Sequence, residues 1–370
     1  YHDRIRDLSP LQPGVNGEPG DLLRKDVLED YLFRLNRHPG RRVDAAIASG
    51  DQPGDVVLDY IVTENKPWTV YFQLSNTGTD QTSEWRERFG FVHNQLLNKD
   101  DTLSLDFITA GFDKANALVA NYDSPFGQSE YLRYKLFGSI SEFKASDVGF
   151  ANENFEGQSW SFGGELDANV WQRHQSFIDI FGGLRFDRHR VDNNAVLVSG
   201  QTEFFIPYVG ARFERNTDKA SNAAEIRLEH NFGSVTTDQN QLNSLGRLFA
   251  DRDWTALKWD ASSSFYLEPL IFGSDWSNPN APYRHTTLAH EIALSLRGQY
   301  AFDHRLGPQE EATAGGLYSV PGYDESAGAG GWDVLMASVS SGGGGGTAGN
   351  PRRRGARRKA ARRPAPSPER

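Results

Sequence analysis

The feature that most constrains this chain is an alternation of apolar and polar residues that recurs from Trp68 to Phe302. It recurs about eleven times, in stretches of roughly ten residues that end in turn-rich breaks. Successive side chains of a strand point to opposite sides, so each stretch predicts a strand with one apolar and one polar face. In the clearest stretch the apolar face would hold Trp160, Phe162, Leu166, Ala168 and Val170, and the polar face Ser161, Glu165, Asp167 and Asn169.

Long strands with charged residues on one face are typical of a barrel that meets lipid outside and water inside. Strands of a soluble sandwich are usually shorter, about five or six residues. The predicted fold class is therefore mainly β, a transmembrane antiparallel β-barrel of which about 11–12 strands are visible. Mixed short and long breaks, such as residues 98–101 against 188–200 and 234–253, fit tight turns at one end and long loops at the other.

Composition agrees with this prediction. No window approaches the 18 or more apolar residues of a transmembrane helix. The mean hydropathy of −0.59 would suggest a soluble protein, but half of each barrel strand faces water. The chain has no cysteine, which excludes disulfides, thiol catalysis and cysteine-based zinc sites. It begins at Tyr1 without a signal peptide, so we expect a mature or truncated form.

The charge is divided unevenly. Residues 351–370 hold nine Lys or Arg and one acidic residue, so of the net charge of −10 the tail carries +8 and the remainder −18. Nucleic-acid binding needs a basic face, so an acidic body argues against that partner. The tail is either a disordered basic segment or the product of a shifted reading frame, since Arg, Ala, Pro and Gly dominate it.

We expect four segments along the chain: a linker or domain fragment (1–20), a small α+β unit (21–66), a partial barrel (67–330) and a low-complexity tail (331–370). In the second segment, helical spacing runs from Asp21 to Asn36, with Asp21 as the N-cap. Residues 42–48 and 56–64 then predict two strands joined by a turn. A twelfth barrel strand over 332–340 would allow a smaller closure, which we regard as the weaker alternative.

Several motifs resemble, in order, those of the two-partner secretion translocators, the haemolysin secretion/activation outer-membrane proteins. Residues 35–43 resemble the "LN..P...V" segment of the family's second POTRA domain, and residues 50–55 its "pG..pG" turn. Residues 75–78, 98–101 and 121–127 are similar to the family's barrel turns. The POTRA motif residues are Leu35, Asn36, Pro39, Val43, Gly50, Pro53 and Gly54.

A second motif, at residues 316–323, is similar to "GG..SVRGY", the tip of a loop that folds into the barrel lumen of this family, expected here over 312–330. Pro321 replaces the family's Arg, a five-donor group that would anchor the loop to a wall carboxylate. The lumen-loop motif residues are Gly316, Ser319, Val320, Pro321, Gly322 and Tyr323.

The resemblance implies a periplasmic POTRA part and a 16-stranded outer-membrane pore that exports a secreted exoprotein in extended form. Its partners would be that exoprotein and outer-membrane lipid, with no nucleic acid, small-molecule substrate or cofactor. Only part of that barrel is visible, and an unclosed sheet leaves bare backbone groups in lipid, so we expect no closed family-type barrel from this chain alone. The alternatives are an assembly factor of the same superfamily, a passive porin and a barrel hydrolase.

Catalysis and metal binding receive little support. His285 and His290 are five residues apart on an expected strand and so face opposite sides, and solvated histidines best explain all nine. Acidic residues facing the lumen could form a catalytic pair, yet a water-filled lumen shows such charges in any case. We therefore predict no enzyme and no catalytic, cofactor or metal residues; the acidic candidates are Glu165, Asp167, Glu225, Glu229 and Glu291.

Overall fold

The computed structural model describes residues 2–12, 14, 22–76, 83–148, 153–194, 198–273, 288–312 and 334–345. The chain divides into two compact units, one of residues 1–265 with 293–340 and one of residues 266–292 with 341–370. In the second unit a short helix, α5 (Glu268–Phe272), lies beside the start of β13, where the Leu267 amide donates to the carbonyl of His290.

The first unit opens with a small α+β part. Helices α1 (His2–Asp7) and α2 (Lys25–Leu35) precede the antiparallel pair β1 (Arg41–Ser49) and β2 (Val56–Glu64). The two strands predicted over 42–48 and 56–64 are confirmed. The prediction of Asp21 as N-cap is wrong: the N-cap is Arg24, without a side-chain capping bond, and Asp21 lies outside the described residues. The buried core of this part is Ile5, Tyr31, Leu35 and Val43.

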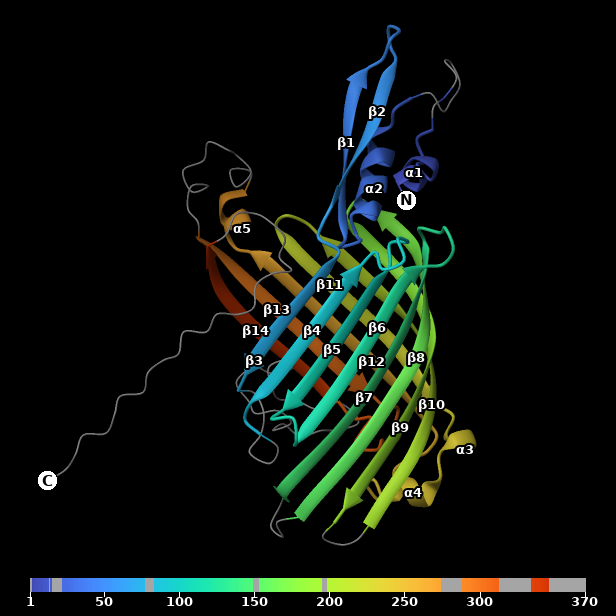
Figure 1. Cartoon of the computed structure of the whole chain (residues 1–370), viewed down its shortest axis with the longest axis vertical. Helices are drawn as coiled ribbons and strands as arrows, with labels where there is room; N and C mark the ends of the chain where they lie inside the picture. Colours follow the sequence, from blue (N-terminus) through green and yellow to red (C-terminus); the bar gives the residue numbers. More distant parts are fainter. Residues whose placement is uncertain are drawn as a thin grey trace, which may run out of the picture. The chain divides into compact units, whose positions relative to one another are not determined.

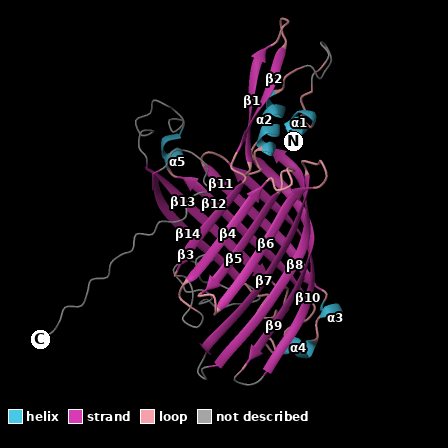
Figure 2. Ribbon diagram, in the orientation of Figure 1, coloured by secondary structure: helices cyan, strands magenta, loops and turns pink. Residues whose placement is uncertain are grey.

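A twelve-stranded antiparallel sheet follows, in which each strand pairs with its neighbours in sequence (Figures 1 and 2). Strands β3 to β13 are the eleven predicted between Trp68 and Phe302. The strands are β3 (Trp68–Ser75), β4 (Arg86–Asn94), β5 (Thr102–Ala110), β6 (Ala115–Pro125), β7 (Leu132–Val148), β8 (Glu153–Arg173), β9 (Ser176–Asn193), β10 (Val198–Asn216), β11 (Ala220–Asn231), β12 (Trp254–Tyr266), β13 (Leu288–Tyr300) and β14 (Val334–Gly345).

Strands β7 to β10 are 17 to 21 residues long, well beyond the predicted ten. The long loop predicted over 188–200 is wrong, because β9 continues to Asn193 and β10 begins at Val198. Polar residues such as Arg188 and His189 occupy both faces there, which hides the alternation although the backbone ladder continues. The loop predicted over 234–253 is confirmed, and the connection between β11 and β12 contains α3 (Gly233–Thr236) and α4 (Gln239–Asn243).

The sheet continues past residue 330, where we expected the alternation to end. Strand β14 pairs with β13, and Met336 is buried while Leu335 and Val339 are exposed. Small residues such as Ala337 and Ser338 occupy several of its other positions, and its last four residues are glycines. They make its alternation weak in the sequence. As described, the order of the sheet leaves β3 and β14 as its two edge strands.

The two faces of the sheet differ as the alternation predicts. One face, called the apolar face below, presents Phe72, Phe162, Leu166, Val209 and Ile226, each at least 47% exposed. The other, the polar face, carries Glu165, Asp167, Asp179, Asp187 and Glu229, all buried. Within the first unit the sheet curves, so that β4 to β7 pass in front of β11 and β12 (Figure 2). None of the helices in the described part of the chain is long and apolar enough to cross a membrane.

Candidate functional site

The polar face carries a ladder of ion pairs. Lys135 Nζ on β7 lies 2.9 Å from Glu165 and 2.8 Å from Asp167 on β8. Arg212 on β10 reaches Asp167 at 2.7 Å and Glu225 on β11 at 2.9 Å. Three of the predicted acidic residues thus share two cations across four strands, which is a structural role and not a free acid pair.

A second group of charges lies further along the same face. Arg185 on β9 pairs with Asp187 at 2.6 Å and with Glu310, which follows β13, at 3.0 Å. Glu229 on β11 is fully buried and lies 2.9 Å from Nζ of Lys258 on β12. These carboxylates are taken out of water, so each depends on its cation.

The segment 301–312 lies across the polar face and packs against the loop between β11 and β12. Leu306 is fully buried in a cluster with Leu242, Leu245 and Trp254. Arg247 of that loop forms an ion pair with Glu311. Apolar contacts and an ion pair therefore hold segment 301–312 against the loop between β11 and β12.

Arginines of the α+β part contact three strands and one turn of the sheet. Arg34 donates to Oε1 of Gln172 at 2.7 Å, and Arg37 pairs with Asp179 at 2.6 Å and Glu214 at 3.2 Å. Arg41 forms a buried ion pair with Asp100 in the turn before β5. The contacts come from α2 and the residues after it, and they reach β8, β9, β10 and the turn before β5.

His38 is buried at the same junction. Its Nδ1 accepts a hydrogen bond from the Gly40 amide at 3.2 Å. Burial is the largest influence and lowers the pKa of His38, against the opposing effect of Asp100. The expectation that all nine histidines are solvated is therefore wrong for His38, and also for His189, whose side chain is 17% exposed.

The POTRA motif residues occupy two places. Asn36 and Val43 exchange hydrogen bonds of 2.8 and 2.7 Å between side chain and backbone, which joins the end of α2 to β1. Gly50 and Gly54 lie in the turn between β1 and β2, where Gly54 has a φ of +98°. Leu35 and Pro39 lie with the first pair and Pro53 with the second. The lumen-loop motif, residues 316–323, lies outside the described residues.

Within the described ranges, one group of side chains has the spacing of a metal site: Asp187, His189 and Glu310. Arg185 already pairs with both of its carboxylates. A bound dication would have to compete with that guanidinium, so the donor set fits an ion pair better than a metal.

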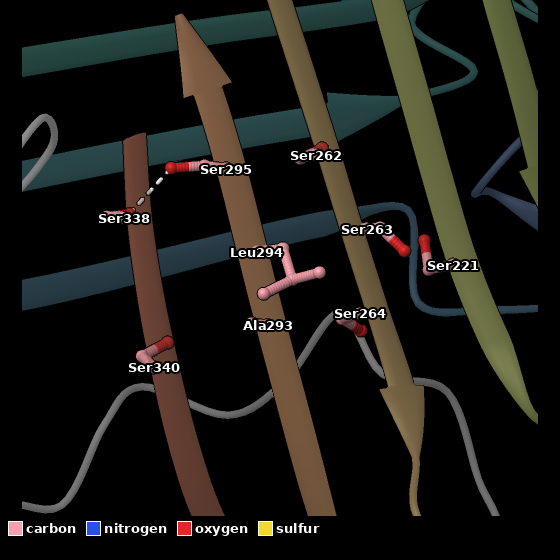
Figure 3. Close-up of a pocket in the computed structure, with 9 residues that line it drawn as sticks. All are labelled: Ser221, Ser262, Ser263, Ser264, Ala293, Leu294, Ser295, Ser338 and Ser340. Atoms are coloured by element: carbon pink, nitrogen blue, oxygen red, sulfur yellow. Dashed lines mark hydrogen bonds between the residues drawn. The ribbon is translucent and has the colours of Figure 1, made fainter. Parts of the chain in front are cut away.

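A shallow hollow lies between β11 and β14 and is lined mainly by serines (Figure 3). Ser295 Oγ lies 2.7 Å from Ser338 Oγ across β13 and β14. The lining offers hydroxyl groups and no titratable side chain. It therefore has no general acid or base.

Sequence reasoning placed the inward acids but missed their partners. Glu310 and Arg185 are 125 positions apart, and Arg37 and Asp179 are 142 apart. Arg185, Asp187 and His189 have the two-residue spacing of one strand face, but His189 lies in the segment 188–200 that was predicted to be a loop. No local signal identified Glu310.

Sequence comparison decides the family. The profile of the haemolysin secretion/activation proteins ShlB/FhaC/HecB matches residues 54–333. The chain belongs to this family.

Two further comparisons agree with this haemolysin secretion/activation family. The outer membrane transporter CdiB-2 of Burkholderia pseudomallei strain 1026b is 24% identical over 320 residues, covering 82% of this chain and 50% of the relative. The structure of CdiB from Escherichia coli has a TM-score of 0.67 at 17% identity, covering 91% of this chain and 58% of that one. CdiB from Acinetobacter baumannii has a TM-score of 0.63 at 15% identity, covering 88% and 55%.

These likenesses confirm the predicted barrel-type fold, and together with the family they support an outer-membrane location. The chain spans about half the length of the curated relative that it matches.

Proposed function

We propose that the chain is the barrel part of a translocator that exports an unfolded partner protein across the outer membrane. The observation that carries the proposal is the two-faced twelve-stranded sheet in a member of a secretion family. Its apolar face suits lipid and its polar face suits a water-filled path. Charges on the polar face are paired, so an extended chain would meet polar groups without a strong field of either sign. No bound nucleotide is needed if folding outside the cell supplies the free energy.

We also propose that residues 21–66 form the C-terminal part of a periplasmic POTRA domain that receives the partner. β1 and β2 form a two-stranded sheet, and an extended segment can add to such an edge through main-chain hydrogen bonds. Ile47, Val56, Val57 and Ile61 of this hairpin are about half exposed and could hold its apolar side chains.

Deleting the full-length gene tests the proposal, with its genomic neighbour as the candidate partner. The partner should disappear from the medium and be degraded or retained in the periplasm, and the gene supplied on a plasmid should restore export. Unchanged secretion would refute the proposal. Loss of many outer-membrane proteins at once would favour the assembly factor instead.

A further inference from the structure

The apolar face of the sheet ends along one row of paired residues. Residues that pair directly on neighbouring strands share a face, and Phe162 on β8, Phe186 on β9 and Phe205 on β10 form one such row of the apolar face. The rings of Phe162 and Phe186 are 5.5 Å apart. Two residues further along the strands, the next row on the same face consists of Trp160, Arg188 and Glu203. The apolar surface therefore gives way to charged groups from one row to the next.

This charged row lies at the end of the sheet away from the α+β part, because the turn between β8 and β9, at the other end, is hydrogen-bonded to α2. From Ser176 to Phe186, β9 has the length of about 9–11 residues that a membrane-spanning strand needs, and it continues to Asn193. When the apolar face contacts lipid, the row of Arg188 therefore lies where the lipid headgroups begin. Trp160, in the same row, is a residue type typical of that level.

Arg188 has hydrogen-bond donors that the protein does not use. Its side chain is 37% exposed and makes no hydrogen bond within the described part of the chain. Its Nε lies 3.8 Å from Oε1 of Glu203, too far for a hydrogen bond, and its Cζ lies 5.9 Å from the centre of the Trp160 ring. A guanidinium has five donors in a planar fork that matches two oxygens of a phosphate group. Arg188 is therefore suited to bind a phosphate at the level of the headgroups.

Arg190 lies one step further out on the same face of β9, and its side chain is 51% exposed. Its Nε and Nη2 donate to Asp192 at 2.9 and 3.4 Å, and its Nη1 takes no part in that pair. The residues that pair with it on β8 and β10 are Gln158 and Gln201, which carry no negative charge. Residues two apart on a strand are separated by about 7 Å, so the two arginines can contact separate phosphate groups.

We propose that Arg188 and Arg190 bind phosphate groups of lipids in the outer leaflet of the outer membrane and so fix the level of the sheet in the bilayer. The partner is a phosphorylated lipid and not a free phosphate, because both side chains continue the face that lipid tails would cover. The inference rests on the proposed periplasmic place of the α+β part, which assigns this end of the sheet to the outer leaflet. Binding would give Arg188 a phosphate at hydrogen-bond distance, where the structure offers a carboxylate at 3.8 Å.

Binding of bisphosphorylated lipid A to the full-length protein in detergent tests the site, with lipid A stripped of both phosphates as the reference. R188Q/R190Q should weaken the affinity for the bisphosphorylated lipid about tenfold, because charge-assisted hydrogen bonds are lost. Its affinity for the stripped lipid should not change, which shows that the variant is folded. The matched control is R173Q/R215Q, which removes two exposed arginines of the same face at the other end of the strands, both paired with Ser176. That control should bind as the wild type does.

Glu203→Gln should have the opposite effect, which a merely structural role of Arg188 would not produce. Loss of the neighbouring carboxylate should tighten the binding of bisphosphorylated lipid A several-fold. Equal weakening by the two double variants would overturn the site, and so would equal affinity of the wild type for the two lipids. Displacement of the lipid by inorganic phosphate would overturn the assignment to a lipid. These affinities do not depend on whether the deletion strain still secretes its partner, so failure of the export proposal is scored separately.

Discussion

At the scale of single residues, the junction between the α+β part and the sheet depends on buried charges. Arg41 and Asp100 are both buried, whereas the neighbouring pair of Arg42 and Asp44 is exposed. Removing one partner of a buried pair leaves the other charge without compensation, but a surface pair contributes little. The two adjacent arginines therefore provide a natural comparison.

We predict that Arg41→Ala destabilises the docked α+β part by about 3 kcal/mol, whereas Arg42→Ala costs less than about 1 kcal/mol. Hydrogen exchange in residues 41–49 measures both effects. Equal effects of the two substitutions would contradict the structure.

His38 should make the same junction sensitive to pH. Its pKa is lowered in the folded state relative to about 6.5 in an unfolded chain, so the unfolded state binds the proton more readily. The contribution of neutral His38 to the stability of this junction is complete above pH 6.5. It is lost as the pH falls from there towards the pKa of His38 in the folded state. Asp100 and Asp123 oppose this shift and Arg133 reinforces it.

Protease cleavage between residues 22 and 64 should therefore be faster at pH 5 than at pH 7.5. Protonation would also remove the acceptor that Nδ1 offers to the Gly40 amide. His38→Gln, which cannot titrate, should abolish most of the difference. If the variant retains the full pH dependence, another group is responsible.

At the scale of strands, aromatic residues on the polar face lie across from glycines of the next strand. Tyr71 pairs with Gly90, Phe181 with Gly210, and Tyr208 with Gly183. A Cβ at Gly183 would lie 2.5 Å from the carbonyl oxygen of Gly164, while a Cβ at Gly182 would have no neighbour closer than 3.7 Å. The glycines make room for the rings and for close approach of the strands.

We predict that Gly183→Ala lowers the free energy of unfolding by about 1–3 kcal/mol, because the backbone of β8 must move. Gly182→Ala, on the other face, should change it by less than about 0.5 kcal/mol. The urea midpoint of the folded form in detergent, read from its mobility on a gel without heating, measures both. A larger loss for Gly182→Ala would refute the packing.

The strands could be predicted because their alternation is local. Leu166 and Asp167 identify their faces by adjacency alone, and the structure confirms both. β14 was largely missed because serine and glycine replace most of the apolar residues that mark a strand. The partners of Arg185 and Arg37 could not be predicted, since curvature of the sheet and docking of α2 bring them together across more than a hundred residues.

At the scale of the whole molecule, the account depends on the two faces meeting different solvents. In a soluble protein, about half of the surface of Phe162 and of Val209 would be exposed to water. Other residues of the apolar face, such as Leu166 and Ile226, would be exposed to a similar extent. So large an apolar surface indicates a lipid or protein partner. Burying the ion-paired polar face in lipid would cost free energy. The apolar face is therefore expected to contact lipid, and the polar face water.

Cysteine labelling tests this claim most directly, because the chain has no cysteine of its own. Ala223→Cys and Ala224→Cys are adjacent on β11, and Ser139→Cys and Ile140→Cys are adjacent on β7. In full-length protein in lipid vesicles, a membrane-impermeant thiol reagent should modify positions 223 and 139 and leave 224 and 140 unmodified. Equal modification of both members of each pair, or modification of positions 224 and 140 alone, would contradict the account.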